Sequence, residues 1–259
     1  MTSNQSRSRW LEGPDAPCPE VPSVAHPFRL VLLGPPGVGK GTQAALLSNR
    51  LGACHLSTGD LFRAARSLDP SQRSDAMCDA VVAMQRGALV PDLTVICLVR
   101  ERIDCLGCPG GFLLDGFPRT LAQARTFERI LARERIRLDA VVRYELPVEV
   151  IVDRIAGRRV CSGCGAVYHV DWRPTTRQGV CDQCRAAVIQ REDDRPAAVH
   201  RRMATYERET QPLVAYYDEL GLLRNVSAHG DPDQICARTL AALDAAGSRL
   251  PGAAGGSTS

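Results

Sequence analysis

Lysine is nearly absent from this sequence of 259 residues. Lys40 is the one lysine among 32 Lys and Arg residues, and it stands inside a glycine-rich stretch. Arginine offers a flat guanidinium with parallel donors, whereas lysine offers a compact point charge that fits among phosphate oxygens. A single lysine kept at this place therefore indicates a site that requires the compact charge.

Further absences exclude whole classes of protein. No apolar run approaches the ~20 residues that a membrane-spanning helix needs, and residues 1–27 lack the apolar segment of a secretory signal. Aromatic residues make up only 5% of the chain, too few to predict a surface on which bases stack. The net charge of +3 is too small to indicate nucleic acid or an anionic membrane as a partner. We therefore expect a cytoplasmic protein.

The eleven cysteines are an odd number, and four of them form two C-x-x-C pairs at the spacing of a metal site, whereas a third such pair, Cys105 and Cys108, has no second pair at that spacing and is interpreted as two ordinary thiols. Cys161 pairs with Cys164 and Cys181 with Cys184, and 16 residues separate the two pairs. This spacing is typical of a tetrahedral zinc site, and four thiolates leave no ligand position for water, so the site is structural. We predict that the metal holds together a segment too poor in apolar residues to form a core. Unliganded thiols or two disulfides are the alternative.

The glycine-rich stretch around Lys40 has the sequence context of a phosphate-binding loop. An apolar segment, residues 28–33, runs into Gly34-Pro35-Pro36-Gly37-Val38-Gly39-Lys40-Gly41-Thr42-Gln43 and then into an amphipathic segment that ends near Leu51. Glycines let successive backbone N–H groups turn toward phosphate, and the start of the helix adds positive potential. The generic pattern has Ser or Thr where this chain has Gly41, with Thr42 one residue later, so the pattern alone argues against a direct hydroxyl ligand for magnesium.

Strand-like and helical segments alternate along the chain, which is typical of α/β proteins with a parallel sheet covered on both faces. One buried strand ends in an acid, Asp115, and is followed at once by Gly116-Phe117-Pro118-Arg119. We predict a core with two insertions and disordered ends. The predicted divisions are a disordered extension at 1–27, a core at 28–249, insertions at 57–90 and 157–194, and a disordered tail at 250–259. An organelle-targeting peptide is the alternative for residues 1–27.

Several arginines stand where the chain leaves the predicted sheet or its insertions. Guanidinium groups suit the transfer of a phosphoryl group to an anionic acceptor, because the transition state spreads charge over the phosphate oxygens. On spacing alone, each arginine could equally lie on a solvated helix surface. The arginines concerned are Arg63, Arg119, Arg154, Arg158, Arg191 and Arg202.

Together these motifs resemble the adenylate kinase family, in its form with a long, zinc-bearing lid, over about residues 28–245. The resemblance implies a P-loop three-layer fold with a five-stranded parallel sheet, an NMP-binding insertion at 57–90 and a zinc lid at 157–194. In this family the loop carries glycine after the lysine, as Gly41 does here. The motifs that carry it are residues 34–43, Ser57-Thr58-Gly59-Asp60-Leu61-Phe62-Arg63, Asp115-Gly116-Phe117-Pro118-Arg119, Asp153-Arg154-Ile155-Ala156-Gly157-Arg158-Arg159-Val160 and Arg191-Glu192-Asp193-Asp194.

The resemblance also implies which residues form the sites. The ATP site comprises Gly37, Val38, Gly39, Lys40, Gly41, Thr42, Arg154, Val167, Tyr168 and Gly230. The AMP site comprises Thr58, Arg63, Ala88, Leu89, Val90, Gly116, Phe117, Pro118, Arg119, Gln123, Arg191 and Arg202. The catalytic residues comprise Lys40, Arg119, Arg158, Arg191, Arg202, Asp115, Asp193 and Asp194, the acids orienting magnesium-bound water or locking the closed lid. The structural Zn²⁺ ligands comprise Cys161, Cys164, Cys181 and Cys184.

The activity implied is reversible transfer of the terminal phosphoryl group of MgATP to AMP, giving two ADP. The implied protein is a monomer whose partners are these nucleotides, with neither nucleic acid nor membrane. The nearest alternative is another nucleoside monophosphate kinase, with UMP, CMP or GMP as acceptor or GTP as donor. Gln123 favours AMP, because an amide both donates and accepts along the edge of adenine. A non-catalytic nucleotide-responsive module and a zinc-ribbon nucleic-acid binder are two more distant candidates.

Overall fold

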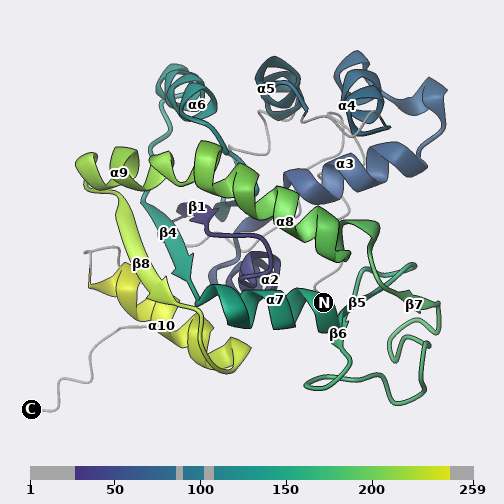
Figure 1. The fold of residues 1–259 in the computed structure, drawn as a ribbon. Coiled ribbons are helices and arrows are strands. Elements are labelled where there is room, and N and C mark those ends of the chain that lie inside the picture. Colours follow the sequence, from purple (N-terminus) through teal and green to yellow (C-terminus); the bar gives the residue numbers. More distant parts are fainter. Residues whose placement is uncertain (1–26, 86–89, 102–107, 246–259) are drawn as a thin grey trace, which may run out of the picture.

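A parallel five-stranded sheet in the order β2-β3-β1-β4-β8 forms the centre of the protein (Figure 1). The structure is a computed structural model that describes residues 27–85, 90–101 and 108–245. The predicted tail at 250–259, nearly all of the predicted extension at 1–27, and Ala88 and Leu89 lie outside these ranges. The strands are β1 (Phe28–Leu33), β2 (Cys54–Ser57), β3 (Gly111–Asp115), β4 (Ala140–Glu145) and β8 (Leu223–Ser227).

Side chains of β1 alternate between two buried cores, one on each face of the sheet. Val31 and Leu33 join the core beneath one set of helices, while Leu30 and Leu32 join the core on the opposite face. Both faces of a central parallel strand are apolar because helices cover both. The three-layer α/β fold predicted from the sequence is confirmed.

Helices cover the two faces of the sheet unequally. The larger core receives side chains from α3 (Thr58–Ser67), α4 (Asp75–Gln85), α5 (Asp92–Arg100), α6 (Leu121–Arg133) and α9 (Pro212–Glu219). The other core receives side chains from α2 (Lys40–Leu51) and α10 (Pro232–Asp244). A short turn, η1 (Pro70–Gln72), joins α3 to α4. None of the helices in the described ranges is long and apolar enough to cross a membrane.

A small three-stranded antiparallel sheet, in the order β6-β5-β7, projects beside the main body where α7 ends (Figure 1). It follows α7 (Val148–Gly157) directly and returns through η3 to α8. Its buried cluster consists of Cys161, Tyr168 and Cys181, which is too small for an independent core. The elements are β5 (Arg158–Cys161), β6 (Val167–His169), β7 (Val188–Ile189), η3 (Glu192–Asp194) and α8 (Pro196–Thr205).

A short π-helical turn lies between the two helices that follow the small sheet. The residues between α8 and α9, Tyr206–Thr210, form one turn of π-helix, labelled η4. A π turn inserts an extra residue into the helical ladder and so re-aims the side chains that follow it. Here it brings the hydroxyl of Thr210 to 3.0 Å from the carbonyl oxygen of Arg119, to which it donates a hydrogen bond.

Candidate active site

The phosphate loop, residues 34–42, follows β1 and ends inside the first turn of α2. Gly34, Gly37 and Gly39 have φ angles of +139°, +82° and +106°, which side-chain-bearing residues rarely adopt. A Cβ atom at Gly37 would lie 2.3 Å from Cγ1 of Ile155, so the loop is also packed too closely for a larger residue there. The Lys40 ammonium donates to the carbonyl oxygens of Gly34 at 2.7 Å and Pro35 at 3.0 Å, and so closes over the loop.

Arg154 joins the loop to the far end of the chain. Its Nη1 atom donates to the carbonyl oxygen of Val38 at 3.2 Å, and Nη2 donates to that of Ala228 at 3.0 Å. Ala228 lies just after β8, close in sequence to Gly230, whose φ angle is +101°. The structure thus places two of the predicted ATP-site residues, Arg154 and Gly230, in one region beside the loop.

The carboxyl ends of β1, β2 and β3 meet at one edge of the sheet. This edge is where parallel α/β sheets bind ligands, because the loops that leave neighbouring strands diverge there. Thr58 follows β2, and its hydroxyl donates to the carbonyl oxygen of Gly116 at 3.0 Å. Arg119 Nε donates to the same oxygen at 2.8 Å. Thr58, Gly116 and Arg119, three of the residues that the resemblance assigns to the AMP site, are thereby held together.

Asp115 ends β3 beside the phosphate loop. Burial alone would raise its pKa, but the imidazole of His55 and the charges of Lys40 and Arg119 outweigh burial and lower the pKa to about 2. His55 Nε2 lies 3.7 Å from Asp115 Oδ2, and the imidazole is 1% exposed. Asp115 is therefore a carboxylate at neutral pH, held by a buried imidazole on one side and facing cations on the other.

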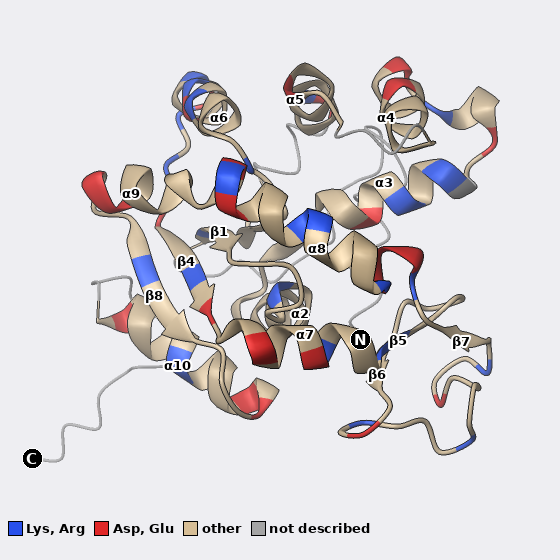
Figure 2. Ribbon diagram, viewed as in Figure 1, with Lys and Arg blue, Asp and Glu red and all other residues tan. Residues whose placement is uncertain are grey.

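The cations of the site converge closely enough to destabilise one another. Burial lowers the pKa of Lys40 from 10.5 to about 8, Asp115 opposes the shift, and Arg119, Arg202 and Arg158 reinforce it. Burial and then the charges of Arg63 and Arg158 lower the pKa of Arg191 to about 10. Clustered cations that lower one another's pKa repel one another, and a bound anion would reduce that repulsion. Figure 2 shows Lys and Arg on α2, α3 and α8, which surround this region.

Two acids of η3 partly neutralise the cluster. Asp194 is 1% exposed and accepts hydrogen bonds from Nε of Arg158 at 2.8 Å and from Nη2 of the same side chain. Arg202 Nη1 lies 3.1 Å from Oδ2 of Asp193 and 3.5 Å from Oδ1 of Asp194. Figure 2 shows this acidic turn next to the start of α8. The pairs hold the arginines in place, and the phosphate loop lies close enough for Arg158 and Arg202 to act on Lys40.

The side chain of Tyr168, a predicted ATP-site residue, already has partners within the small sheet. Tyr168 is 6% exposed, its hydroxyl lies 3.3 Å from Sγ of Cys181, and it accepts from the backbone N–H of Asp182 at 3.0 Å. The phenol is therefore engaged inside the small sheet, and the backbone of Tyr168 pairs with that of Arg159 in the neighbouring strand β5. Val90 is half-buried against the larger core, while Ala88 and Leu89 are outside the described residues.

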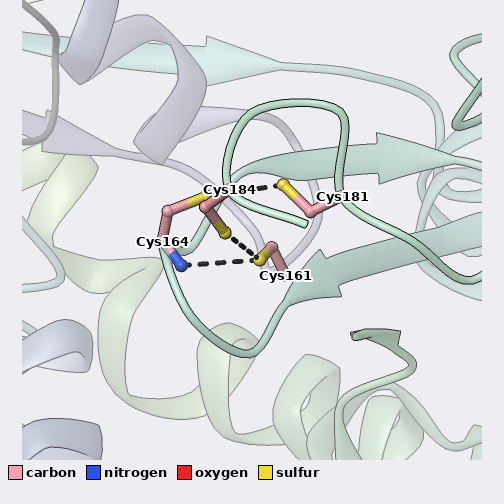
Figure 3. A group of neighbouring side chains, drawn as sticks. All are labelled: Cys161, Cys164, Cys181 and Cys184. Carbon is pink, nitrogen blue, oxygen red and sulfur yellow. Dashed lines mark hydrogen bonds between the residues drawn. The ribbon is translucent and has the colours of Figure 1, made fainter. Parts of the chain in front are cut away.

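The four predicted metal ligands lie together. Sγ atoms of Cys161, Cys164, Cys181 and Cys184 all lie within 4.8 Å of one another, and Figure 3 shows the side chains converging from two loops. The Sγ–Sγ distance is 3.3 Å between Cys161 and Cys184 and 3.6 Å between Cys164 and Cys181. Thiolates about 2.3 Å from a tetrahedral zinc ion lie roughly 3.8 Å apart, so the four sulfur atoms are close enough together to hold one zinc ion after small shifts.

Comparison with known proteins decides the family. A family model described as adenylate kinase matches residues 32–222. An adenylate kinase of Citrifermentans bemidjiense is 46% identical over 219 residues, which cover 84% of this chain and 100% of that protein. Adenylate kinases of Streptomyces avermitilis and Clostridium acetobutylicum are 44% and 43% identical, covering 83% and 80% of this chain and 97% and 95% of their own lengths.

The chain belongs to the adenylate kinase family. The resemblance drawn from the phosphate loop and the arginine motifs is thereby confirmed, as is the prediction that the protein is an enzyme, an adenylate kinase. The cysteine cluster supports the zinc-lid form of the family.

Two residues of this adenylate kinase contact the site although the sequence did not single them out for it. His55 has no metal-ligand spacing, which predicts a structural or solvent-facing side chain, yet its imidazole lies against Asp115. Its position in the short strand that runs directly into Ser57-Thr58-Gly59-Asp60 was the available signal. Thr210 reaches Arg119 from the last position of the π turn, and no periodicity in the sequence indicates that turn.

Proposed function

We propose that this adenylate kinase transfers the terminal phosphoryl group of MgATP to AMP, reversibly, giving two ADP. The observation that carries the proposal is the convergence of Lys40 with Arg119, Arg158 and Arg202 at the carboxyl edge of the sheet. A site with this excess of buried positive charge suits two polyanions that would otherwise repel each other.

The phosphate loop and its neighbours form the donor site in this proposal. Backbone N–H groups from Gly37 to Thr42 and the ammonium of Lys40 hold the ATP phosphates. Arg154, Gly230 and the backbone of Val167 and Tyr168 border the base and ribose. Arg154 is supported in this role because its two hydrogen bonds already span the loop and the segment after β8.

The acceptor site lies on the other side of β1 in this proposal. Thr58, Arg63 and Arg119 hold the AMP phosphate, and the amide of Gln123 pairs with adenine. The residues assigned with them are Ala88, Leu89, Val90, Gly116, Phe117, Pro118, Arg191 and Arg202. The hydrogen bonds of Thr58 and Arg119 to Gly116 support this grouping.

The chemistry needs no general base, because the phosphate of AMP is already an ionised nucleophile at neutral pH. Lys40, Arg119, Arg158, Arg191 and Arg202 hold the two phosphates in line and stabilise the charge of the transition state. Mg²⁺ bound with ATP supplies further charge neutralisation. Asp115 suits a water ligand of that ion, since its pKa of about 2 keeps it ionised. Asp193 and Asp194 position the arginines from η3.

Two insertions close over the nucleotides in this proposal and exclude water, which would otherwise accept the phosphoryl group. They are the NMP-binding insertion, residues 57–90, and the lid, residues 157–194, set in a core of residues 28–249. The lid would be held by Zn²⁺ on Cys161, Cys164, Cys181 and Cys184, which cross-links its two loops. Metal analysis of the purified protein tests this, and we expect one zinc ion per chain.

The deciding experiment is a coupled assay of ADP formation over a panel of acceptors (AMP, IMP, GMP, CMP, UMP) and donors (ATP, GTP). We expect ATP with AMP to give the highest kcat/KM. Preference for another acceptor would favour a different nucleoside monophosphate kinase, and binding of ATP and AMP without ADP formation would favour a non-catalytic module. The expectations of a cytoplasmic monomer without nucleic-acid or membrane partners are tested by sedimentation and by fractionation of cells.

A further inference from the structure

The amide of Gln123 is held between two fixed partners. Gln123 lies in the first turn of α6 and is 3% exposed. Its Nε2 atom donates to Oδ1 of Asp92 at 2.7 Å, and its Oε1 atom accepts from the backbone N–H of Arg119 at 2.8 Å. Each partner therefore uses one hydrogen-bonding position of the amide and leaves one N–H and one lone pair for other contacts.

The chemistry of these partners permits only one orientation of the amide. A carboxylate accepts hydrogen bonds and a backbone N–H donates them. Turning the Gln123 amide by 180° would place Oε1 against the carboxylate of Asp92 and the NH₂ group against the N–H of Arg119. Both contacts would then be repulsive inside a buried site, where unpaired polar groups are costly.

Asp92 is itself tethered. Its Oδ2 atom accepts from the hydroxyl of Thr120 at 2.8 Å, and Thr120 caps α6 by accepting from the backbone N–H of Gln123 at 3.1 Å. Asp92 also stands in the first turn of α5, where the helix favours a negative charge. The carboxylate thus joins the start of α5 to the start of α6 and has no freedom to follow a turning amide.

The orientation of the amide decides which base it can pair with. At position 6, adenine carries an amino group, which donates, whereas guanine and hypoxanthine carry an oxygen, which accepts. An amide that can turn pairs with either kind of base, because it offers an acceptor at one end and a donor at the other. An amide held in one orientation forms hydrogen bonds with only one kind of purine, 6-amino or 6-oxo, and places like hydrogen-bonding groups against the other kind.

We propose that Asp92 is a positioning residue that sets the base selectivity of the acceptor site. It holds the Gln123 amide in the orientation that accepts a 6-amino purine monophosphate and rejects a 6-oxo purine monophosphate. The proposal rests on the acceptor site proposed above, in which Gln123 faces the base. Asp92 itself does not touch the nucleotide.

The test compares AMP with IMP, which differ in the purine only at the N1–C6 edge. Asp92→Asn keeps the size of the side chain but lets it donate or accept, so residue 92 no longer excludes the turned orientation of Gln123, which only the backbone N–H of Arg119 then opposes. We expect the ratio of kcat/KM for AMP to that for IMP to narrow at least about tenfold. The change should arise from a higher KM for AMP and a measurable rate with IMP, with kcat for AMP within about threefold of the unchanged protein.

The matched control is Asp75→Asn, which removes an exposed acid from the first turn of α4, and it should leave the ratio unchanged. Thr120→Val removes the hydrogen bond that tethers Asp92 and should narrow the ratio of AMP to IMP by a smaller factor. This second variant tests the role of Asp92 if Asp92→Asn does not fold. A ratio that stays constant in these variants, even where kcat/KM falls equally for both acceptors, overturns the role of Asp92. A wild-type protein that prefers IMP would contradict the proposed function itself.

Discussion

Arg158 and Asp194 join the two ends of the segment that carries the four clustered cysteines through a two-pronged ion pair. Arg158 begins β5 and Asp194 ends η3, and both nitrogen donors of Arg158 reach the carboxylate. The Asp194 side chain is fully buried, and that of Arg158 is 19% exposed. The pair therefore fixes the base of the proposed lid and holds the Arg158 guanidinium in place.

Asp194→Asn should destabilise the protein by about 2 kcal/mol, because the variant leaves a largely buried guanidinium without its counter-charge. The corresponding fall in Tm for a domain of this size is about 4 to 8 °C. Differential scanning calorimetry measures it. Asp193→Asn is the matched control, since Asp193 is 44% exposed and its removal should cost less than about 1 kcal/mol. Equal falls in Tm for Asp194→Asn and Asp193→Asn would contradict the claim that the buried ion pair of Asp194 stabilises the protein.

Local sequence patterns predicted most of the fold. The strand, glycine loop and helix around Lys40 and the cysteine spacing are each continuous stretches of about two dozen residues with a recognisable local pattern, so the sequence predicted them. The pair of Arg158 with Asp194 joins residues 36 apart, and that of Gln123 with Asp92 joins residues 31 apart. Such pairings depend on how α5, α6 and the small sheet pack, and no local pattern encodes that packing. The π turn at Tyr206–Thr210 was likewise invisible.

Lys40→Met should lower kcat/KM at least about a thousandfold, since it removes a positioned charge from both substrate phosphates. It should leave Tm unchanged or higher. Burial lowers the pKa of Lys40 to about 8, below its value in an unfolded chain, so the charged lysine costs the folded state free energy at pH 7. ADP formation and calorimetry are the two measurements. A variant that keeps its activity would contradict the proposed donor site.

The affinity for ATP should fall as pH rises above about 8. In the ligand-free protein Lys40 loses its proton near that pH, whereas bound phosphate raises its pKa, so binding takes up a proton. The expected slope approaches a tenfold loss of affinity per pH unit. Isothermal titration calorimetry in buffers of different ionisation enthalpy measures the uptake directly. Lys40→Met should show no uptake above pH 8, and uptake of the same size in this variant would assign the proton elsewhere.

Removal of metal should unfold the small sheet before the core. Strands of two to four residues around Cys161, Tyr168 and Cys181 bury too little apolar surface to persist without a cross-link. We expect Cys164→Ser to abolish zinc binding and to open residues 158–190 to proteolysis, while the main sheet stays intact. Cys97→Ser, at an exposed thiol on α5, is the control. A protease-resistant segment in the metal-free variant would show that packing alone suffices.

Gly157 lies where α7 meets the proposed lid, and the ring of His169 occupies the space of its missing side chain. A Cβ atom there would lie 2.1 Å from Nε2 of His169, which stacks on Trp172 with ring centroids 3.9 Å apart. Gly157→Ala should therefore displace the ring and lower stability by about 1 to 3 kcal/mol. In the double variant Gly157→Ala with His169→Ala the clash is gone. The loss of stability in the double variant should therefore be smaller than the sum of the losses in the two single variants. Strict additivity in calorimetry would mean that the histidine ring does not fix the junction.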